Sequence, residues 1–292
     1  MYIGSIPDYC MGISDTLYVL DSRQRVVHAV TLYGERLFAF GGHGQGPGEF
    51  ESPRAIAFDG RSVYVADWSL LRLTQFSATG EYLRTITLPA QVWSLAVVDG
   101  TIYAAGATYS NAALWRITLA QEPQVSPFLR LGEGPLAEYE WPGPAGRRFI
   151  TSHGALLFFS LPSHNNVVVI DPSAGQSDWK VLAPVGPTLR EHRRQFEVAL
   201  RELQQRGGNS GWAPFRRVVP LSADKLMLEM TLTIDGVMTG VGVVVSSQTG
   251  EETGEWVIPK DPRSLTPRLL GETHIGWVDA ENAQLVVYIR PW

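Results

Sequence analysis

Arginine recurs where turns lead into short apolar segments, a setting in which a guanidinium can bind an anion. The residues in this setting are Arg54, Arg147, Arg148, Arg216 and Arg217. A guanidinium donates to carboxylate or phosphate in bidentate geometry. In a chain with 24 Lys and Arg against 29 Asp and Glu, this grouping predicts an anion site. The alternative is that each arginine pairs with a nearby carboxylate such as Asp8, Glu49 or Glu51.

A second set of residues, aromatic or polar, is expected close to these arginines. Its members are Trp68, Trp93, Tyr109, Trp141 and His164. Aromatic surface with a few polar groups suits a polar organic ligand or a peptide. Taken singly, each polar loop residue is also an ordinary turn former. The two sets together form the predicted ligand-binding residues.

Residue types for metal or covalent chemistry are present without the spacing that such chemistry needs. The histidines are His28, His43, His153, His164, His192 and His274, and none forms an HxH or HExxH pair. The sequence therefore has no metal motif, and it leaves the cofactor undetermined. Cys10 is the single cysteine, no GxSxG motif occurs, and the thiol is expected to be a small buried group.

The elements that must position these residues are short strands. Residues 40–86 contain four of them, predicted at 55–58, 62–66, 72–76 and 82–86. Turn pairs such as Asp59-Gly60 and Thr79-Gly80 separate them. Four short antiparallel strands joined by tight turns make one blade of a β-propeller.

The same stretch resembles an NHL repeat. The residues that carry the resemblance are Gly44, Gly46, Gly48, Phe50, Pro53, Tyr64, Val65, Asp67, Arg72, Phe76 and Gly80. The likeness extends over residues 12–88 and departs at Leu70-Leu71, where the repeat usually has Asn-His. It implies a six-bladed propeller. Six-bladed relatives include a zinc-dependent lyase and metal-dependent lactonases, whose His and carboxylate ligands are not matched on the inner strands here.

Six units follow when the second strand of each is aligned. Tyr18 and Tyr64 lie 46 residues apart, and Tyr103 follows 39 residues later, which are spacings typical of propeller repeats. The last unit offers three strands before the chain ends at Trp292. The N-terminal residues 2–6 are expected to supply its missing outer strand, because a bare edge invites aggregation.

Two insertions, 131–146 and 184–215, both lead from a fourth strand to the next first strand. The second contains a predicted helix at 188–206, with Thr188 and Glu191 as a capping box. Both insertions are expected on one face of a single domain that spans residues 1–292. There they would wall or roof the central depression; the alternative is that they only protect blade edges.

Composition limits the partners. A net charge of −5 and a pI near 5.7 give no general attraction to nucleic acid. No apolar run approaches the roughly 20 residues that span a bilayer. The chain starts without a signal peptide, which fits a soluble protein, either cytoplasmic or the mature form of an exported one. A monomer is expected.

These features favour a binding protein whose capped face takes an anionic small molecule, glycan or peptide. The alternative is a hydrolase, lyase or cyclase with its active site in the same pocket. A third class is a protein-interaction scaffold. A buried acid or converging histidines would favour catalysis, whereas an exposed apolar patch would favour the scaffold.

Overall fold

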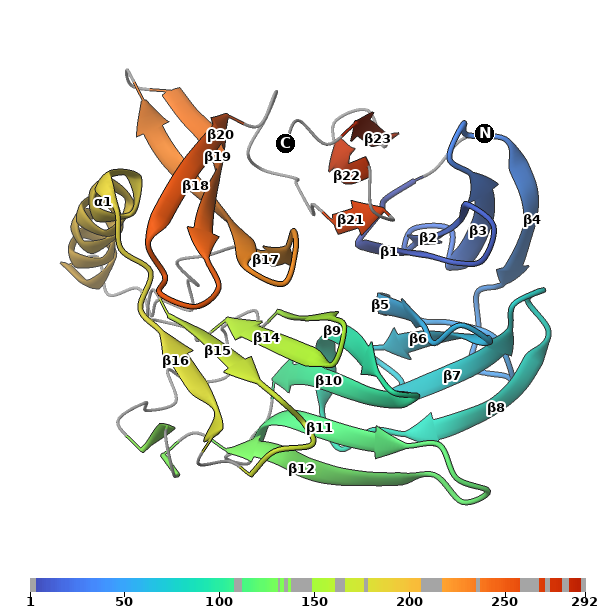
Figure 1. The fold of residues 1–292 in the computed structure, drawn as a ribbon. Helices are drawn as coiled ribbons and strands as arrows, with labels where there is room; N and C mark the ends of the chain where they lie inside the picture. The colour runs from blue at the N-terminus through green and yellow to red at the C-terminus, as the bar shows by residue number, and fades with distance from the viewer. Residues whose placement is uncertain are drawn as a thin grey trace.

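The computed structural model describes a ring of small antiparallel sheets (Figure 1). The described residues are 4–107, 112–130, 132–133, 136–137, 149–160, 166–175, 178–205, 217–234, 237–257, 268–270, 274–279 and 284–289. In these ranges there are six sheets, five with four strands and one with three, and within each sheet the strands pair in chain order. The protein is a six-bladed β-propeller, as the sequence predicted.

The first three blades have four strands each. Blade 1 contains β1 (Asp8–Met11), β2 (Thr16–Asp21), β3 (Val26–Thr31) and β4 (Arg36–Gly41). Blade 2 contains β5 (Pro53–Phe58), β6 (Ser62–Asp67), β7 (Arg72–Ser77) and β8 (Tyr82–Thr87). Blade 3 contains β9 (Gln91–Val98), β10 (Thr101–Ala107), β11 (Ala112–Thr118) and β12 (Gln124–Arg130). The strands predicted for blade 2 are confirmed to within two residues.

The other three blades complete the ring. Blade 4 contains β13 (Ile150–His153), β14 (Leu156–Ser160), β15 (Val167–Ile170) and β16 (Lys180–Leu182). Blade 5 contains β17 (Arg217–Pro220), β18 (Lys225–Ile234), β19 (Val237–Ser246) and β20 (Glu252–Val257). Blade 6 contains β21 (Arg268–Leu270), β22 (His274–Asp279) and β23 (Gln284–Ile289).

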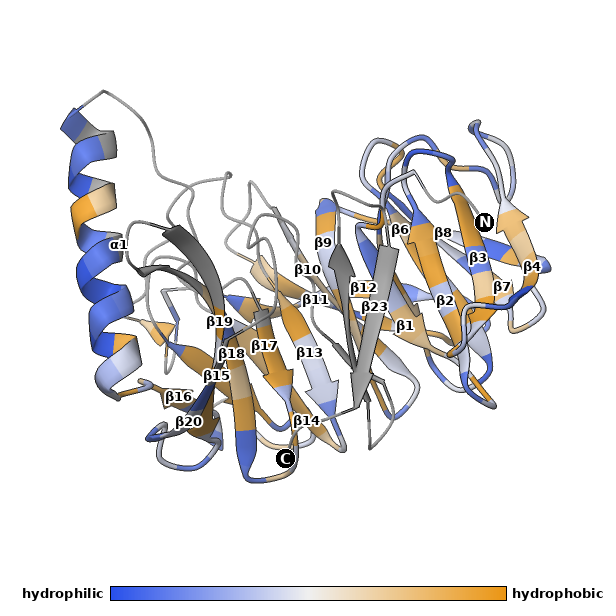
Figure 2. Cartoon of the chain, turned by 90° about the horizontal axis from the view of Figure 1, so that it is seen from above, coloured by the Kyte–Doolittle hydropathy of each residue, from blue (hydrophilic) through white to orange (hydrophobic). Residues whose placement is uncertain are grey.

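The first strand of every blade is the innermost. β1 contacts β5, β5 contacts β9, and the series continues through β13, β17 and β21 back to β1. The core lies between neighbouring blades, where apolar side chains from adjacent sheets interlock. Tyr64 and Ala66 of blade 2, for example, pack with Val92, Leu95 and Ile102 of blade 3. Figure 2 shows the apolar residues concentrated along the strands.

The N-terminal segment is held by blade 1. The amide of Gly4 donates to Oδ2 of Asp21 at 2.6 Å, and the amide of Ser22 donates to the carbonyl of Ser5 at 2.9 Å. Gly4 and Ser5 are therefore anchored to blade 1 through the Asp21 carboxylate. The outer strand predicted for blade 6 from residues 2–6 falls partly outside the described residues. Residues 1–3 lie outside the described residues.

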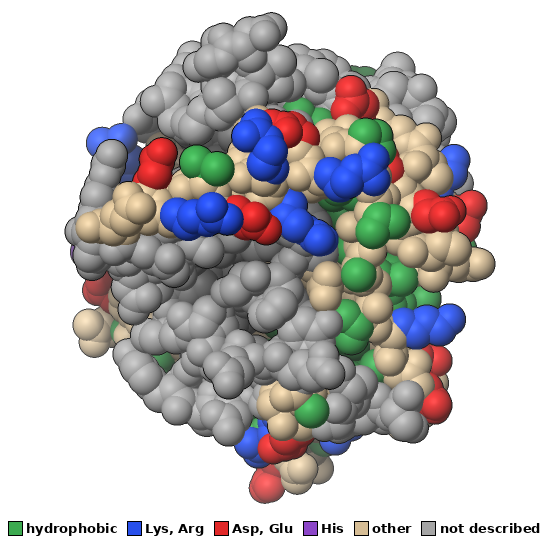
Figure 3. All heavy atoms as spheres, turned by 90° about the vertical axis from the view of Figure 1, so that its left-hand side faces the viewer, with side chains coloured by type: hydrophobic (Ala, Val, Ile, Leu, Met, Phe, Trp, Pro, Cys, Tyr) green, Lys and Arg blue, Asp and Glu red, His purple; other side chains and the backbone are tan. Residues whose placement is uncertain are grey.

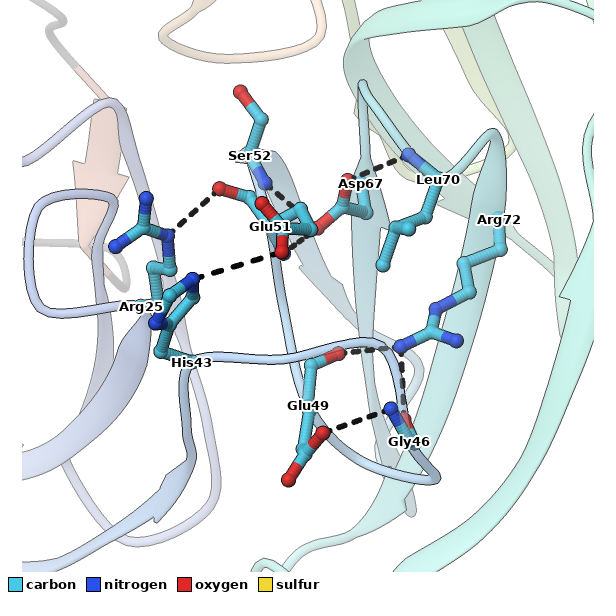
Figure 4. Close-up of polar contacts among 9 residues, drawn as sticks. All are labelled: Arg25, His43, Gly46, Glu49, Glu51, Ser52, Asp67, Leu70 and Arg72. Atoms are coloured by element: carbon cyan, nitrogen blue, oxygen red, sulfur yellow. Dashed lines mark hydrogen bonds and ion pairs between the residues drawn. The ribbon is translucent and has the colours of Figure 1, made fainter.

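A buried aspartate at the end of the second strand organises blade 2 (Figure 4). Oδ2 of Asp67 accepts the amides of Glu51 at 2.8 Å and Ser52 at 3.0 Å, just before β5. Oδ1 accepts the amides of Ser69 and Leu70, both at 3.0 Å, in the β6–β7 turn. One carboxylate thus fixes both chain segments on this face of the blade.

Blade 1 repeats this arrangement 46 residues earlier. Oδ1 of Asp21 accepts the amides of Arg23 and Gln24, each at 2.9 Å, in the β2–β3 turn. It also accepts the amide of Ser5 at 3.3 Å, while Oδ2 accepts Gly4. The segment before β1 therefore occupies the place that residues 51–52 occupy before β5.

The glycine-rich loop between blades 1 and 2 is held by Arg72, the arginine of the repeat. Its guanidinium donates to the carbonyls of Gly46 at 2.9 Å and Glu49 at 2.6 Å (Figure 4). It also donates to the carbonyl of Gln45 at 2.8 Å. Gly44 has a φ of +152°, and a Cβ there would collide with the Glu49 carboxylate. The signature residues of the repeat are therefore structural in this blade.

The helix α1 (Pro187–Gln205) begins with proline, whose missing N–H is no loss at that position. Its cap is supplied by β20: the Thr188 amide donates to Oε2 of Glu252 at 3.1 Å, and the Thr188 hydroxyl donates to Oε2 of Glu255 at 2.7 Å. Glu191 instead accepts from Arg194. The predicted capping box is therefore wrong, because the amide and hydroxyl of Thr188 are bound by two carboxylates of β20 and not by Glu191.

The helix lies against the outer part of blade 5 and away from the centre of the ring (Figures 1 and 2). It contacts β18 and β20, and Leu189 joins the core between blades 4 and 5. Along its outer side Arg and Glu side chains alternate (Figure 3). The expectation that the second insertion roofs the central depression is thus wrong for its helix.

Replacement of Asp67 with alanine should destabilise the protein strongly. The change leaves four backbone N–H groups without the carboxylate that accepts them, which costs at least about 3 kcal/mol of unfolding free energy. Urea unfolding measures this cost. Glu81→Ala, an exposed carboxylate in the same blade, is the control and should change stability by less than about 0.5 kcal/mol. Equal losses in both variants would contradict the role of Asp67.

Candidate functional site

Three of the predicted ligand-binding residues lie together at the rim of the ring. Arg54 follows the first residue of β5, Trp68 lies in the β6–β7 turn, and Trp93 lies near the start of β9. The guanidinium carbon of Arg54 lies over the Trp68 ring, 6.0 Å from its centroid. The rings of Trp68 and Trp93 contact each other edge to face, with centroids 4.0 Å apart and planes at 68°. We call this group the Arg54 corner.

Arg54 and Trp93 both occupy β-bulges of inner strands. On β5, Pro53 pairs with Asp67 and Ala55 pairs with Ala66, which leaves Arg54 without an opposing residue. On β9, Val92 pairs with Gly106 and Ser94 pairs with Ala105, which leaves Trp93 without an opposing residue in the ladder. A bulge redirects a side chain out of the pleat, and bulges are common beside active sites. Arg54 is exposed and Trp93 half-buried, although the residues on either side of each are buried.

Trp68 is fixed by its backbone. Its amide donates to the carbonyl of Ser52 at 2.9 Å, and the Asp67 carboxylate holds the two residues that follow it. At the far end of this turn, the Leu88 amide donates to the carbonyl of Leu71 at 2.8 Å. The β6–β7 turn, which carries the ring beneath Arg54, is therefore hydrogen-bonded to the connections on both sides of blade 2.

The carboxylates that were the alternative partners of Arg54 are engaged elsewhere. Oε2 of Glu49 accepts the Gly46 amide at 2.8 Å, and Oε1 of Glu51 lies 3.6 Å from Nε2 of His43 (Figure 4). Oδ2 of Asp8 accepts the Ile56 amide at 3.0 Å. Among the described residues, no ion pair involves Arg54. Its charge is accessible to solvent over an aromatic face.

The structure places only part of the remaining predicted set. Arg217 is the first residue of β17, and its position is described through the strand only. The predicted residues that lie outside the described residues are Tyr109, Trp141, Arg147, Arg148, His164 and Arg216. From the first insertion, Leu136 is described, and it is buried in the core between blades 3 and 4.

Two buried polar residues, one on the inner strand of blade 3 and one on the second strand of blade 5, were missed by the sequence analysis. The Ser94 hydroxyl donates to the Ile150 carbonyl at 2.8 Å and accepts its amide at 3.2 Å, which joins β9 to β13. Glu229 is 1% exposed and lies directly opposite Arg217 in the β17–β18 register. Directly opposed residues have neighbouring Cβ atoms on one face. A buried acid therefore lies next to a predicted rim arginine.

Ser94 and the Arg217–Glu229 pair lie at one position of the repeat, which the alignment of second strands could have identified. Asp8, Ser94 and Arg217 each pair with the residue two places after the aligned centre of the second strand. Asp8 and Ser94 both bond to the inner strand of the following blade. Polar residues at this position therefore connect the inner strands around the axis.

Metal and membrane features were also tested within the described ranges. No group of three or more His, Cys, Asp or Glu side chains there could hold a metal ion. Cys10 is buried, as expected, between blades 1 and 2. No helix in the described part of the chain has the length and apolar character needed to cross a membrane.

Sequence comparison supports the class of protein. A family model described as a 6-bladed beta-propeller matches residues 3–114. No curated protein matches the chain in sequence. The six-bladed propeller implied by the NHL resemblance is confirmed at the level of this class.

Solved structures with the same architecture span nearly the whole chain. A protein of unknown function from Bacteroides thetaiotaomicron has a TM-score of 0.60 at 10% identity, covering 98% of this chain and 70% of its own. Virginiamycin B lyase from Staphylococcus aureus has a TM-score of 0.56 at 14% identity, covering 99% and 85%. Hydrazine synthase from Kuenenia stuttgartiensis has a TM-score of 0.55 at 12% identity, covering 96% and 78%. At these identities the likeness shows the fold alone.

Acid should weaken the helix in the second insertion. His192 is 5% exposed, and burial lowers its pKa to about 4. The unfolded chain takes up this proton below about pH 6.5, so stability present above that pH is lost progressively down to about pH 4, by up to about 3 kcal/mol. Urea unfolding at several pH values measures the loss. His192→Leu should reduce it, whereas the exposed His43→Gln should not; an unchanged loss in His192→Leu would contradict this prediction.

Proposed function

We propose that the rim around the Arg54 corner binds an anionic small molecule, glycan or peptide. The observation that supports this most is Arg54 itself, an exposed guanidinium that a bulge directs out of β5 and that has no ion-pair partner among the described residues. Within the part of the chain that the structure describes, no carboxylate pairs with it, although the chain as a whole is acidic. An anion with two oxygens in one plane suits this group best.

The neighbouring rings prepare Arg54 for binding. A free arginine side chain loses rotamer freedom when it binds, and contact with Trp68 restricts that freedom in advance. Trp68 and Trp93 also offer half-buried apolar surface beside the charge. The ligand class is therefore an anion with an apolar or ring-shaped body.

The other predicted residues would extend the same site around the rim. Arg147, Arg148, Arg216 and Arg217 would supply further positive charge, because they precede or begin inner strands as Arg54 does. Tyr109, Trp141 and His164 would contact the body of the ligand. These assignments are part of the proposal.

A lyase, hydrolase or cyclase is the second candidate, and Glu229 is the observation that favours it. A carboxylate that is 1% exposed, opposite an arginine at the start of an inner strand, is a suitable acid or base for a reaction at the axis. Virginiamycin B lyase is a propeller of similar architecture, and fold alone does not transfer its activity.

Native mass spectrometry and elemental analysis of the purified protein separate the two candidates. A copurified anion supports the binding proposal. A stoichiometric divalent metal would instead favour the enzyme, and a protein that is empty and ignores every anion offered would contradict both.

Replacement of Arg54 with alanine should weaken anion binding at least about tenfold, the effect of losing one charge-assisted contact. Isothermal titration with the copurified anion, or with citrate and inorganic phosphate when none copurifies, measures the affinity. Arg61→Ala makes the same charge change in the same blade, on an exposed residue in the β5–β6 turn of the opposite face, and should bind normally. The double variant Arg54→Ala/Arg217→Ala should bind more weakly still. Unchanged affinity in the double variant would refute the proposal.

A further inference from the structure

A buried histidine lies beside the aspartate that holds the N-terminal segment. Nε2 of His28 is 3.9 Å from Oδ2 of Asp21, and the two side chains are 4% and 0% exposed. Neither ring nitrogen of His28 has a hydrogen-bond partner among the described residues. The same oxygen, Oδ2, accepts the Gly4 amide at 2.6 Å. One carboxylate oxygen therefore lies between an existing donor and a potential one.

Blade 2 contains the matched arrangement without the histidine. Thr74 pairs with Val65 as His28 pairs with Val19, which places the two residues at the same position of the repeat. Thr74 is fully buried beside β6, and Asp67 holds Glu51 and Ser52 there as Asp21 holds Gly4 and Ser5. The carboxylate is common to both blades, and the titratable neighbour belongs to blade 1 alone.

We propose that His28 and Asp21 form an acid-sensitive latch for the N-terminal segment Gly4–Ser5. At neutral pH the imidazole is neutral and the carboxylate binds the two amides. When His28 takes up a proton, its Nε2–H becomes a charged donor that competes with the Gly4 amide for Oδ2. The carboxylate turns towards the imidazolium, and the N-terminal segment is released.

Burial and the charges around His28 determine the pH at which the imidazole takes up its proton. Burial lowers its pKa, Asp21 opposes that shift, and Arg36 of β4 and the amino terminus add to it. The pKa of His28 therefore lies below the ordinary range of histidine. A buried imidazolium with unsatisfied N–H groups is costly, and the Asp21 carboxylate offers an acceptor 3.9 Å from Nε2. Protonation consequently favours the rearranged state.

Release would act on the seam where the ring closes. Gly4 and Ser5 lead directly into β1, and β1 contacts β21 of the last blade. Gly4 also packs closely on Arg23, where a Cβ would lie 2.7 Å from the Arg23 Cβ. Loss of this anchor loosens the connection before β1 and leaves the matching connection before β5 in place.

Site-resolved amide hydrogen exchange between pH 7.5 and pH 5 tests the latch. The measured quantity is the protection of Gly4 and Ser5 divided by that of Glu51 and Ser52, because the ratio removes the general effect of pH on exchange. We expect the ratio to fall about tenfold at acidic pH, the effect of one charge-assisted bond. Its midpoint should coincide with the titration of the His28 ring observed by NMR.

Two variants exchange the residues of the matched positions. His28→Thr should make the ratio independent of pH, and Thr74→His should give acid sensitivity to Glu51 and Ser52. A constant ratio in the unmodified protein, or a midpoint that differs from the ring titration, would overturn the proposal. If the protection ratio of His28→Thr still falls at acidic pH, the carboxylate and not His28 is responsible, which also overturns the proposal. The protection ratio and the ring titration are both measured on the unmodified protein, so the test does not depend on whether a variant folds.

Discussion

The organisation of the rim depends on a buried carboxylate at the end of the second strand. Asp67 binds four amides, two in the connection that enters the blade and two in the turn that faces the axis. These two segments carry Arg54 and Trp68. Without the carboxylate, four N–H groups near the protein interior would need other acceptors. The rim residues are therefore positioned by an interaction that has no ligand-binding role of its own.

The blade pattern could be predicted because its causes are local. Alternating apolar residues, Gly-containing turns and the Asp67 and Arg72 positions all lie within one 46-residue unit. The residue before the third strand shows this well: Arg25 and Leu71 adopt φ of +58° and +49°. Leu71 stands where the repeat usually has the His of its Asn-His pair, and His is enriched among non-glycine residues with positive φ. The departure at Leu71 therefore changes local strain and leaves the fold intact.

The helix cap, the anchor of the N-terminal segment and the exposure of the rim residues could not be predicted, because they depend on residues distant in sequence or on the strand register. The helix start is capped by Glu252, 64 residues further along the chain, whereas the predicted capping box considered only neighbours. The amides of Gly4 and Ser5 are bound by Asp21, 17 and 16 residues further along the chain. The bulges at Arg54 and Trp93 depend on a register that the sequence pattern does not encode. Sequence thus located the rim residues but not the geometry that exposes them.

In a repeated fold, residues that serve a function of one blade alone occupy positions that differ between blades. Blades 1 and 2 share the aspartate and its four amides, yet one has His28 where the other has Thr74. The shared residues hold the ring together, so they are constrained in both blades. The residues that differ have no such shared structural role. They can therefore carry other groups, such as the exposed charge of Arg54 or the titratable ring of His28. In this chain the shared positions build the blade, and the positions that differ carry the groups on which both proposals rest.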